Sequence, residues 1–265
     1  MHDIDHRFER VGLLGYGTMG AAIARVLAAS GRTVTVVDIV EARLEEASDH
    51  VTSTRAVSDL HGVDLVIESV IENLDVKRAL LAEVASVVGE GVPIVTTTSG
   101  FSVTEVSTAV LNPERVAGLH FSIRAPGANV VEVVRGVRTE DTVVQRLVSF
   151  VEALDKAAVV VDDKPGFLID SLLLPYFNDV VQALDDGLAT AADIDLALEL
   201  GLGYKRGPLA MLDGTGLDVH LDETSALHAR TGDPRYSPPP LLQLMVAAGH
   251  HGAKNGNGFR TSERD

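Results

Sequence analysis

The sequence predicts an α/β fold, in which an N-terminal Rossmann-type doubly wound sheet precedes a smaller, all-helical C-terminal domain. Short β-rich runs alternate with helical patterns over the first 162 residues. A glycine-rich loop joins the first of these runs to the first helical pattern. Strand-like runs then stop, and helical patterns dominate the remainder. We therefore place a domain boundary after Asp162, which divides the chain into residues 1–162 and 163–265.

Seven runs rich in β-branched residues predict the strands of the sheet, namely Arg10–Leu14, Thr33–Val37, Asp64–Glu68, Pro93–Thr97, Arg115–Phe121, Val130–Val134 and Ala157–Val161. Apolar periodicity between the runs predicts the helices Met19–Ala29, Leu44–Val51, Leu74–Val88, Val103–Val110 and Asp141–Leu154. A capping box, Ser102-x-x-Glu105, begins the fourth helix. Such alternation is typical of a parallel sheet with crossover helices.

The second domain is predicted to be helical from residue 167 to residue 229 and again over Leu241–Ala248. Pro175 lies within the first of these helical patterns and is expected to kink the helix or to lie near its start. At the domain boundary, Asp162-Asp163 is expected to form a solvated turn.

The glycine-rich loop, Gly15-x-Gly17-x-x-Gly20, has the spacing of a dinucleotide-binding loop. Gly15 permits the tight turn, Gly17 lets a pyrophosphate approach the backbone, and Gly20 lets the helix pack against the strand. The N–H groups of the helix start, at Thr18 and Met19, would face the phosphates. A glycine-rich turn without a ligand is the alternative, but the order of strand, loop, helix, strand and acid favours a dinucleotide-binding domain over residues 1–162.

The acid in this order is Asp38, which ends the second strand and predicts NAD rather than NADP as cofactor. Its carboxylate would accept hydrogen bonds from the adenosine ribose. A 2′-phosphate at about 4 Å would be repelled by ~1 kcal/mol in water and by up to ~4 kcal/mol near a protein surface. Ile39 follows, and the nearest arginine, Arg43, offers no obvious compensating cation.

The composition excludes several classes of function. A net charge of −16 argues against nucleic acid or an anionic membrane as partner. No apolar run is long enough to span a bilayer, and no charged-then-apolar leader is present at the N-terminus. The absence of cysteine excludes disulfides, thiolate nucleophiles and zinc–thiolate sites, and we expect no metal site. We expect a soluble, cytoplasmic protein.

Three polar residues in or next to predicted strands are candidates for chemistry. Ser99 follows one strand, His120 lies near the end of the next, and Glu132 lies in the β-run after it. Oxidation of an alcohol needs a base for the hydroxyl proton, and histidine has a suitable pKa. A carboxylate can fix its tautomer, and a hydroxyl can orient the substrate oxygen. Each residue also has an ordinary structural explanation, and spacing alone does not decide between the two.

The chain resembles the 3-hydroxyacyl-CoA dehydrogenase family over nearly its whole length. The motifs that carry the resemblance are Gly15-Tyr-Gly-Thr-Met-Gly20, Val66-Ile-Glu68, Glu72-Asn-Leu-Asp-Val-Lys77, Thr97-Thr-Ser99, Gly118-Leu-His-Phe121, Val131-Glu-Val-Val134, Lys164-Pro-Gly-Phe167, Gly207-Pro-Leu209 and Lys254-Asn-Gly-Asn-Gly-Phe259. The resemblance implies an NAD-dependent enzyme that interconverts a 3-hydroxyacyl thioester and its 3-oxo form.

The resemblance also implies roles for individual residues. His120 would be the general base, Glu132 its partner, and Ser99 the group that holds the substrate oxygen beside the cofactor. Further family positions near the cofactor are Glu72, Lys77 and Lys254. The helical domain, residues 163–265, would then contribute to substrate binding and form a homodimer.

Three departures from the family pattern bear on the substrate. Asp170 stands where the family has a catalytic asparagine, and an ionised carboxylate cannot donate a hydrogen bond. The family's His-Phe-Phe-Asn-Pro is here His120-Phe-Ser-Ile-Arg124, so Ile123 replaces a polar residue and Arg124 adds a cation. Only Ile39 to Val63 is available where relatives carry a long helical hairpin that helps to hold acyl-CoA.

These departures leave alternatives to a free acyl-CoA substrate. The enzyme would then oxidise a small polar 3-hydroxyacyl group, glyceryl- or seryl-like, tethered to an acyl carrier protein. Asp170 would accept a hydrogen bond from a donor group on this substrate, such as a 2-hydroxyl or a 2-ammonium group. Arg124 would pair with a phosphopantetheine phosphate or with an acidic carrier. Alternatively, Asp170 is protonated beside Glu132 and mimics the asparagine.

Two other protein classes share features with this sequence. In a non-catalytic NAD-binding protein, the family's asparagines could be lost, as at Asp170 and Ile123. The presence of Ser99, His120 and Glu132 together argues against this class. The β-hydroxyacid dehydrogenases use a lysine on the long helix after the sheet. This chain has no lysine or arginine between Pro165 and Tyr204.

Overall fold

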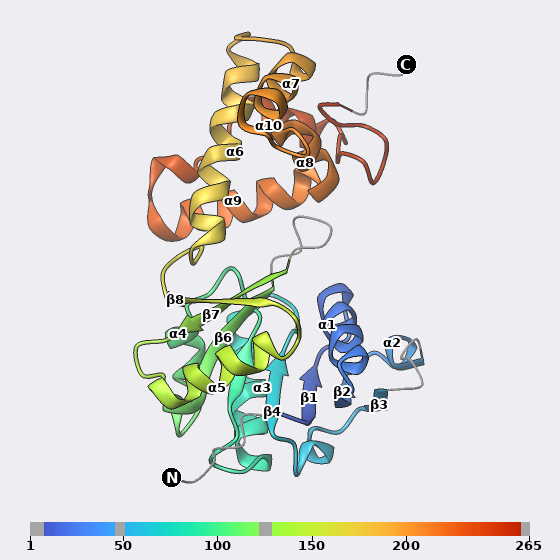
Figure 1. Cartoon of the computed structure of the whole chain (residues 1–265), viewed down its shortest axis with the longest axis vertical. Coiled ribbons are helices and arrows are strands. Elements are labelled where there is room, and N and C mark those ends of the chain that lie inside the picture. The colour runs from blue at the N-terminus through green and yellow to red at the C-terminus, as the bar shows by residue number, and fades with distance from the viewer. Residues whose placement is uncertain (1–7, 46–50, 122–128, 261–265) are drawn as a thin grey trace. The chain divides into compact units, whose positions relative to one another are not determined.

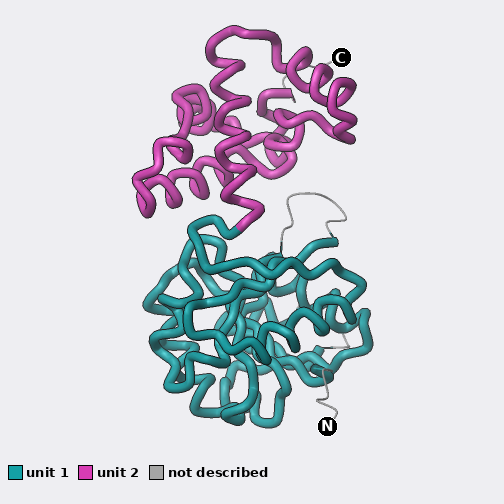
Figure 2. Tube along the Cα trace, turned by 60° about the vertical axis from the view of Figure 1, so that its left-hand side comes forward, with its two compact units in different colours: residues 1–122, 129–167 teal, residues 123–128, 168–265 magenta. Residues whose placement is uncertain are grey.

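The computed structural model describes residues 8–45, 51–121 and 129–260. The described residues form two compact units, the first ending at Phe167 and the second starting at Leu168 (Figure 2). None of the helices in these ranges is both long and apolar enough to cross a bilayer.

The first unit contains a sheet of eight strands in the order β3-β2-β1-β4-β5-β6-β7-β8. The strands are β1 (Arg10–Leu14), β2 (Thr33–Val37), β3 (Val51–Thr54), β4 (Leu65–Glu68), β5 (Ile94–Thr96), β6 (Val116–Phe121), β7 (Val130–Arg135) and β8 (Ala157–Asp162). The first six are parallel, and their order 3-2-1-4-5-6 is that of the doubly wound dinucleotide-binding fold. The predicted fold class is therefore confirmed. Strand β7 runs antiparallel to β6, which the sequence patterns did not indicate.

The crossover helices of this unit are α1 (Thr18–Ala29), α2 (Glu41–Glu45), α3 (Leu74–Val87), α4 (Val103–Ser107) and α5 (Asp141–Glu152) (Figure 1). The prediction for Leu44–Val51 was wrong. Its first two residues, Leu44 and Glu45, belong to α2, residues 46–50 lie outside the described residues, and Val51 begins strand β3, which was missed. The strand is only four residues long and lies at the sheet edge, where it is half exposed and lacks the apolar run typical of a buried strand.

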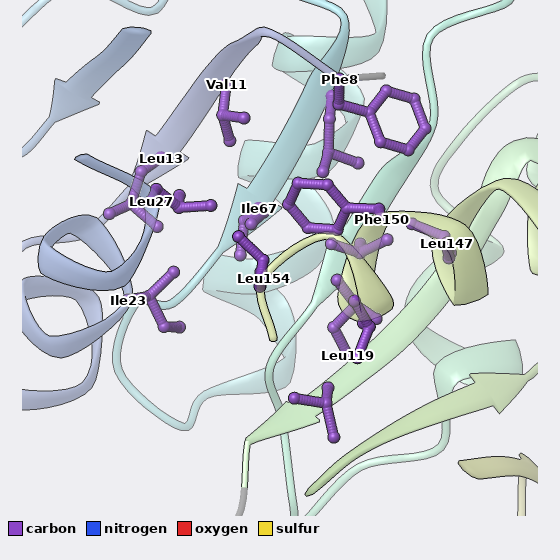
Figure 3. Close-up of a cluster of buried hydrophobic side chains, with 14 of the residues drawn as sticks. Phe8, Val11, Leu13, Ile23, Leu27, Ile67, Leu119, Leu147, Phe150 and Leu154 are labelled. Atoms are coloured by element: carbon purple, nitrogen blue, oxygen red, sulfur yellow. The ribbon is translucent and has the colours of Figure 1, made fainter. Parts of the chain in front are cut away.

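Residues on the two faces of the sheet enter two separate cores because side chains alternate along a strand. One face packs against α1 and α5, with Val11 and Leu13 of β1 beside Leu27 and Phe150 (Figure 3). The other face packs against α3 and α4, where Leu14 of β1 belongs to the same cluster as residues of both helices. Helices therefore cover both faces of the parallel sheet, as a doubly wound fold requires.

The second unit is all-helical among its described residues. Its helices are α6 (Ile169–Asp185), α7 (Ala191–Leu202), α8 (Pro208–Thr215), α9 (Leu217–Thr231) and α10 (Pro240–Ala247). Their buried faces form one main apolar cluster that includes Phe177, Leu212 and Leu242. Pro175 lies inside α6, seven residues into the helix when Ile169 is counted as the first.

Candidate active site

Three glycines shape the loop between β1 and α1. Gly15 has φ +92°, and a Cβ there would lie 2.4 Å from the Ser69 carbonyl oxygen at the end of β4. A Cβ on Gly20 would lie 2.1 Å from the Gly15 carbonyl oxygen. Around Gly17, in contrast, a Cβ would meet nothing within 4 Å. Gly15 and Gly20 are therefore required by the fold, whereas Gly17 leaves open space at the start of α1 where a phosphate can approach.

The loop lies where the order of the sheet reverses, because β1 has β2 on one side and β4 on the other. Ligands bind doubly wound sheets at such a switch point, beyond the carboxyl ends of the strands. Thr18 and Met19 form the first helical positions of α1, where backbone N–H groups have no intrahelical acceptor. This arrangement fits the pyrophosphate of a dinucleotide.

Asp38 follows β2 and is 5% exposed. Its carboxylate accepts hydrogen bonds from the backbone N–H of Tyr16 (2.7 Å) and of Val40 (2.8 Å). Asp38 therefore also supports the glycine loop through Tyr16. The Arg43 guanidinium lies 3.5 Å from the same carboxylate. The sequence offered no obvious cation here, so this contact is a correction: the fold brings Arg43 back from the first turns of α2 to the acid.

His120 and Glu132 are direct partners across the antiparallel strands β6 and β7. His120 Nδ1 donates a 2.6 Å hydrogen bond to Glu132 Oε2. Glu132 is fully buried, and His120 is 8% exposed at the carboxyl end of β6. Because a carboxylate only accepts, this contact places the Nδ1 proton on the side of Glu132 and leaves the lone pair of the neutral ring on Nε2. In this arrangement Nε2 of the neutral ring can accept a proton.

Phe167 forms one side of the histidine's surroundings. Its ring centroid lies 5.5 Å from that of His120, and its backbone has φ +47°, in the left-handed region. The preceding Gly166 also has positive φ, and the Phe167 N–H donates to the Lys164 carbonyl. The Lys-Pro-Gly-Phe motif is therefore a tight turn that places an apolar ring against His120.

Ser99 lies in the loop after β5 and is half-buried. Its hydroxyl has no hydrogen-bond partner among the residues that the structure describes. The flanking residues, in contrast, are held by Glu72, which accepts hydrogen bonds from the Thr98 hydroxyl and from the Gly100 N–H (3.0 Å). The Ser99 hydroxyl is thus presented by a fixed loop.

Lys77 was predicted to lie near the cofactor, and the structure places its ammonium group in a buried ion pair. The side chain is 1% exposed and lies 2.8 Å from Glu68 Oε1 and 3.2 Å from Glu72 Oε2. Glu68 is fully buried and also accepts from the Thr96 hydroxyl at 2.6 Å. The sequence analysis did not predict Glu68 as a site residue, because an acid at the end of a strand does not indicate which distant residues it will contact.

The expectation of a merely solvated turn at Asp162-Asp163 was wrong for the second acid. Asp163 accepts hydrogen bonds from the Ser102 hydroxyl (2.6 Å) and from the N–H groups of Val103 (3.0 Å) and Thr104 (2.7 Å). The negative charge at the start of α4 is stabilising. Asp163 therefore caps this helix from a distance of about 60 residues in the sequence.

The remaining predicted residues lie in the second unit or outside the described ranges. Asp170, in the first turn of α6, is 2% exposed. Burial raises the pKa of the Tyr236 phenol, Arg235 opposes this shift, and the negative charges of Asp233 and Asp170 add to it. The Asp170 carboxylate is therefore close enough to the Tyr236 phenol to interact with it electrostatically. Arg124 and Ile123 lie outside the residues that the structure describes.

Lys254 lies in the loop after α10 and forms an ion pair with Asp218 of α9. Burial alone would raise the pKa of Asp218, but the Lys254 ammonium, the Val219 N–H and the nearby His251 hold it below its ordinary value. Asp213 fixes the end of the same loop because its carboxylate accepts from the N–H of Phe259 (2.8 Å). The loop thus presents Lys254 in a defined position within its unit.

Two family models match the chain. The model described as the 3-hydroxyacyl-CoA dehydrogenase NAD-binding domain matches residues 10–59 and 46–164. The model described as the C-terminal domain of 3-hydroxyacyl-CoA dehydrogenase matches residues 166–262.

Curated relatives and solved structures agree with these matches. The human mitochondrial hydroxyacyl-coenzyme A dehydrogenase is 33% identical, over 95% of this chain and 90% of its own. The 3-hydroxybutyryl-CoA dehydrogenase of Bradyrhizobium diazoefficiens is 32% identical, over 95% and 94%. The structure of (S)-3-hydroxybutyryl-CoA dehydrogenase PaaH1 from Ralstonia eutropha has a TM-score of 0.88 and 32% identity, over 96% and 98%. The chain belongs to the 3-hydroxyacyl-CoA dehydrogenase family.

Proposed function

We propose that the protein is an NAD-dependent oxidoreductase that interconverts a 3-hydroxyacyl thioester and its 3-oxo form. The observation that carries this proposal is the buried His120–Glu132 pair, joined at 2.6 Å, at the carboxyl end of β6. It belongs to the same sheet as the glycine loop, whose open Gly17 position suits a dinucleotide. The two sequence relatives cited above are named hydroxyacyl-coenzyme A dehydrogenase and 3-hydroxybutyryl-CoA dehydrogenase.

In this proposal His120 is the general base. Its Nε2 takes the proton of the 3-hydroxyl group during oxidation and returns it during reduction. Glu132 keeps the Nδ1 proton in place and stabilises the imidazolium ion that forms. Bound NAD supplies the hydride acceptor. The Ser99 hydroxyl, which has no partner among the described residues, donates to the substrate oxygen and keeps it within reach of His120.

The cofactor would be held by backbone N–H groups and by the side chains of Asp38, Glu72, Lys77, Ser99 and Lys254. Gly15, Gly17 and Gly20, with the N–H groups of Thr18 and Met19, form the pyrophosphate site. The open space at Gly17 would accommodate the pyrophosphate, and a side chain at this position would fill that space. The Asp38 carboxylate would give up one of its two hydrogen bonds from backbone N–H groups and accept hydrogen bonds from the ribose hydroxyls instead. Lys254, paired with Asp218, is proposed as a further cofactor residue from the second unit.

Asp170 is proposed to contact substrate and to set substrate choice. It is almost fully buried in the first turn of α6. We propose two ways in which it could contact the substrate. A protonated Asp170 would donate to the thioester as an amide does, or an ionised Asp170 would accept from a 2-hydroxyl or 2-ammonium group on the substrate.

The second arrangement supports a distinct candidate, a dehydrogenase for a small polar 3-hydroxyacyl group on an acyl carrier protein. Between β2 and β4, the described residues form only the five-residue helix α2, strand β3 and a short 3-10 turn over Val57–Leu60. This segment offers little surface for a CoA nucleotide. Arg124, outside the described residues, would pair with the phosphopantetheine phosphate or with an acidic carrier.

We also propose that the protein forms a homodimer through its second unit. Helix α7 leaves large apolar side chains in solvent, with Leu196 52%, Leu200 79% and Leu202 62% exposed. Burying such leucines would stabilise an interface by roughly 25 cal/mol per Å² of apolar area. Light scattering of the protein and of a Leu196→Glu, Leu200→Glu variant tests this, since the variant is expected to be monomeric.

The function is tested by following NADH oxidation with acetoacetyl-CoA, acetoacetyl-pantetheine and acetoacetyl carrier protein in parallel. His120→Ala serves as the blank for each. Turnover of the CoA ester supports the general proposal and shows that the enzyme acts on acyl-CoA with aspartate at position 170. Turnover on the carrier-bound group alone supports the second candidate. Binding of NADH without turnover on any of the three would contradict both.

A further inference from the structure

A residue with a strained backbone packs against the histidine that Glu132 orients. Phe167 has φ +47°, in the left-handed region, which is uncommon for any residue other than glycine and unfavourable for a bulky one. Its side chain is nevertheless buried, and its ring centroid lies 5.5 Å from that of His120, with 56° between the ring planes. A strained conformation persists only where the surrounding contacts fix it, and such residues gather at functional sites.

Hydrogen bonds hold the turn that ends at Phe167. At its start, the Asp163 N–H donates to the Arg135 carbonyl at the end of β7 (3.1 Å), and the Asp163 carboxylate accepts from the Val103 N–H of α4 (3.0 Å). At its end, the Phe167 N–H donates to the Lys164 carbonyl at 2.8 Å. The turn is therefore fixed to the sheet and to α4, and these contacts hold the strained residue in place.

The Phe167 ring lies on the face of the sheet that carries the histidine and its carboxylate. Side chains two residues apart share a face of a strand, so His120 and position 118 lie on the same face of β6. Their cross-strand partners on β7 are Glu132 and Val134. Val134 and Phe167 belong to one buried cluster, and a Cβ on Gly118 would lie 2.9 Å from Val134 Cβ. Phe167 therefore packs on the face from which His120 and Glu132 project.

The imidazole of His120 is thus contacted from two directions. Glu132 Oε2 accepts from Nδ1 at 2.6 Å, which fixes the tautomer but acts on a single atom of the ring. One hydrogen bond leaves a ring able to pivot about the bonded atom, whereas a second ring packed against it resists that movement. A general base must keep its acceptor atom within hydrogen-bond reach of the proton that it takes. The orientation of Nε2 therefore depends on both contacts.

We infer that Phe167 is a positioning residue, which holds the His120 imidazole in the orientation where Nε2 reaches the substrate hydroxyl. This inference rests on the proposed function because it takes His120 to be the general base. It also gives the strained backbone a role, since the turn that strains Phe167 is the turn that brings its ring to His120. The alternative is a phenylalanine that only fills the apolar cluster.

Phe167→Leu is the most direct test because leucine keeps the position apolar and removes the planar ring. Leucine, like phenylalanine, has no branch at Cβ, so the left-handed backbone does not become more strained. Phe167→Met is the second variant, since a flexible side chain fills the space that leucine leaves. Phe150→Leu, at a buried phenylalanine of α5 in the other core of the sheet, is the matched control for the same chemical change.

Three quantities are measured on the full-length protein. The first is kcat and KM for whichever acetoacetyl thioester the wild type turns over, and the second is the NADH dissociation constant by fluorescence titration. The third is the nitrogen NMR signal of the His120 ring, identified by its loss in His120→Gln. At about pH 9 an ordinary imidazole is neutral, and proton–nitrogen correlations then show which ring nitrogen carries the proton.

We expect both Phe167 variants to lower kcat by about 10- to 100-fold, as misplacement of a reacting group does, with KM and the NADH dissociation constant within about twofold. His120 should show one form, protonated on Nδ1, in the wild type and in Phe150→Leu. Both Phe167 variants should show an average of the two tautomers. Wild-type kcat in both Phe167 variants overturns the inference, and so does an equal loss of kcat in Phe150→Leu.

A double-mutant cycle separates positioning of His120 from an independent role of Phe167. Phe167→Leu is added to His120→Gln, and the residual activity is measured at raised enzyme concentration. If Phe167 acts only through His120, the second substitution lowers this activity by less than about twofold. A full additional loss in the His120→Gln background overturns the inference.

Failure of the proposed function gives a different result. A wild-type protein that binds NADH but turns over none of the three thioesters contradicts the function. The NMR signal still decides how the imidazole is held. One Nδ1-protonated form in the wild type and an averaged signal in Phe167→Leu then support the orienting contact, and the same signal in both proteins overturns it.

Discussion

Two loops at the carboxyl edge of the same sheet are built by opposite means. The loop after β1 takes its shape from the absence of side chains at Gly15 and Gly20, where a Cβ would collide with backbone oxygens. The loop after β5 takes its shape from charged and hydroxyl side chains, with Glu72 and Lys77 at the centre. The first presents free backbone N–H groups, which suit a phosphate. The second presents one hydroxyl in a fixed place, which suits a reacting oxygen.

The difference has consequences for how each loop tolerates change. A glycine loop is destabilised when atoms are added, and a network built on a buried ion pair is destabilised when atoms are removed. Substitutions of both kinds, ordered from the largest expected effect to the smallest, therefore test whether the two loops differ in this way.

Removing the cation from the second loop should have the largest effect. Lys77→Met leaves Glu68 fully buried without its ion pair, and we expect a loss of about 3–5 kcal/mol in the free energy of unfolding. Denaturant unfolding monitored by circular dichroism measures it. The double variant Lys77→Met, Glu68→Met should recover part of the loss. No recovery would show that packing of the lysine stem, rather than the unpaired carboxylate, carries the effect.

Adding one methyl group to the first loop should have the next largest effect. Gly15→Ala combines a positive φ with a Cβ 2.4 Å from the Ser69 carbonyl oxygen, and we expect a loss of about 3 kcal/mol. Thermal unfolding checks this. A loss below ~1 kcal/mol would mean that the end of β4 moves away easily and that Gly15 is not required by the fold.

Gly17→Ala separates the fold of the loop from its ligand. A Cβ there meets nothing within 4 Å, so the free energy of unfolding should change by less than ~0.5 kcal/mol. NADH should nevertheless bind about tenfold more weakly, a cost of about 1.4 kcal/mol, because the methyl group enters the space for the pyrophosphate. Titration of intrinsic NADH fluorescence measures the affinity. Unchanged affinity would place the cofactor elsewhere.

The smallest effect is expected at the exposed pair Lys254–Asp218 in the second unit. Asp218→Asn should cost less than ~1 kcal/mol at neutral pH. Because the folded pKa of Asp218 lies below the ordinary value of a carboxyl group, the carboxylate's contribution to stability is present above that ordinary value and is lost as pH falls through the lower folded pKa. The difference in unfolding free energy between the two proteins should therefore shrink below about pH 4. A difference that is constant with pH would exclude the charge as its source.

The two loops also differ in how far the sequence predicted them. Each glycine of the first loop has its own backbone role, so the glycine spacing, together with the order of strand, helix, strand and acid around it, predicted this loop. The second loop depends on partners that lie 5 to 28 residues apart in the sequence, and no local pattern connects Glu68 with Lys77 or Thr96. Strand β3 and the helix cap supplied by Asp163 were missed for the same reason, since both depend on neighbours in space. The pairing of Glu132 with His120 was implied by the resemblance, and its geometry came from the reversal of β7.

Steady-state oxidation of NADH with acetoacetyl-CoA or its carrier-bound form, by wild type and by His120→Gln, tests the central claim most directly. Both proteins are assayed at NADH concentrations that saturate each of them. The account predicts turnover by the wild type and a loss of about 100- to 10,000-fold in kcat for His120→Gln, with unchanged NADH affinity. Equal turnover by the two proteins would contradict the assignment of His120 as the general base.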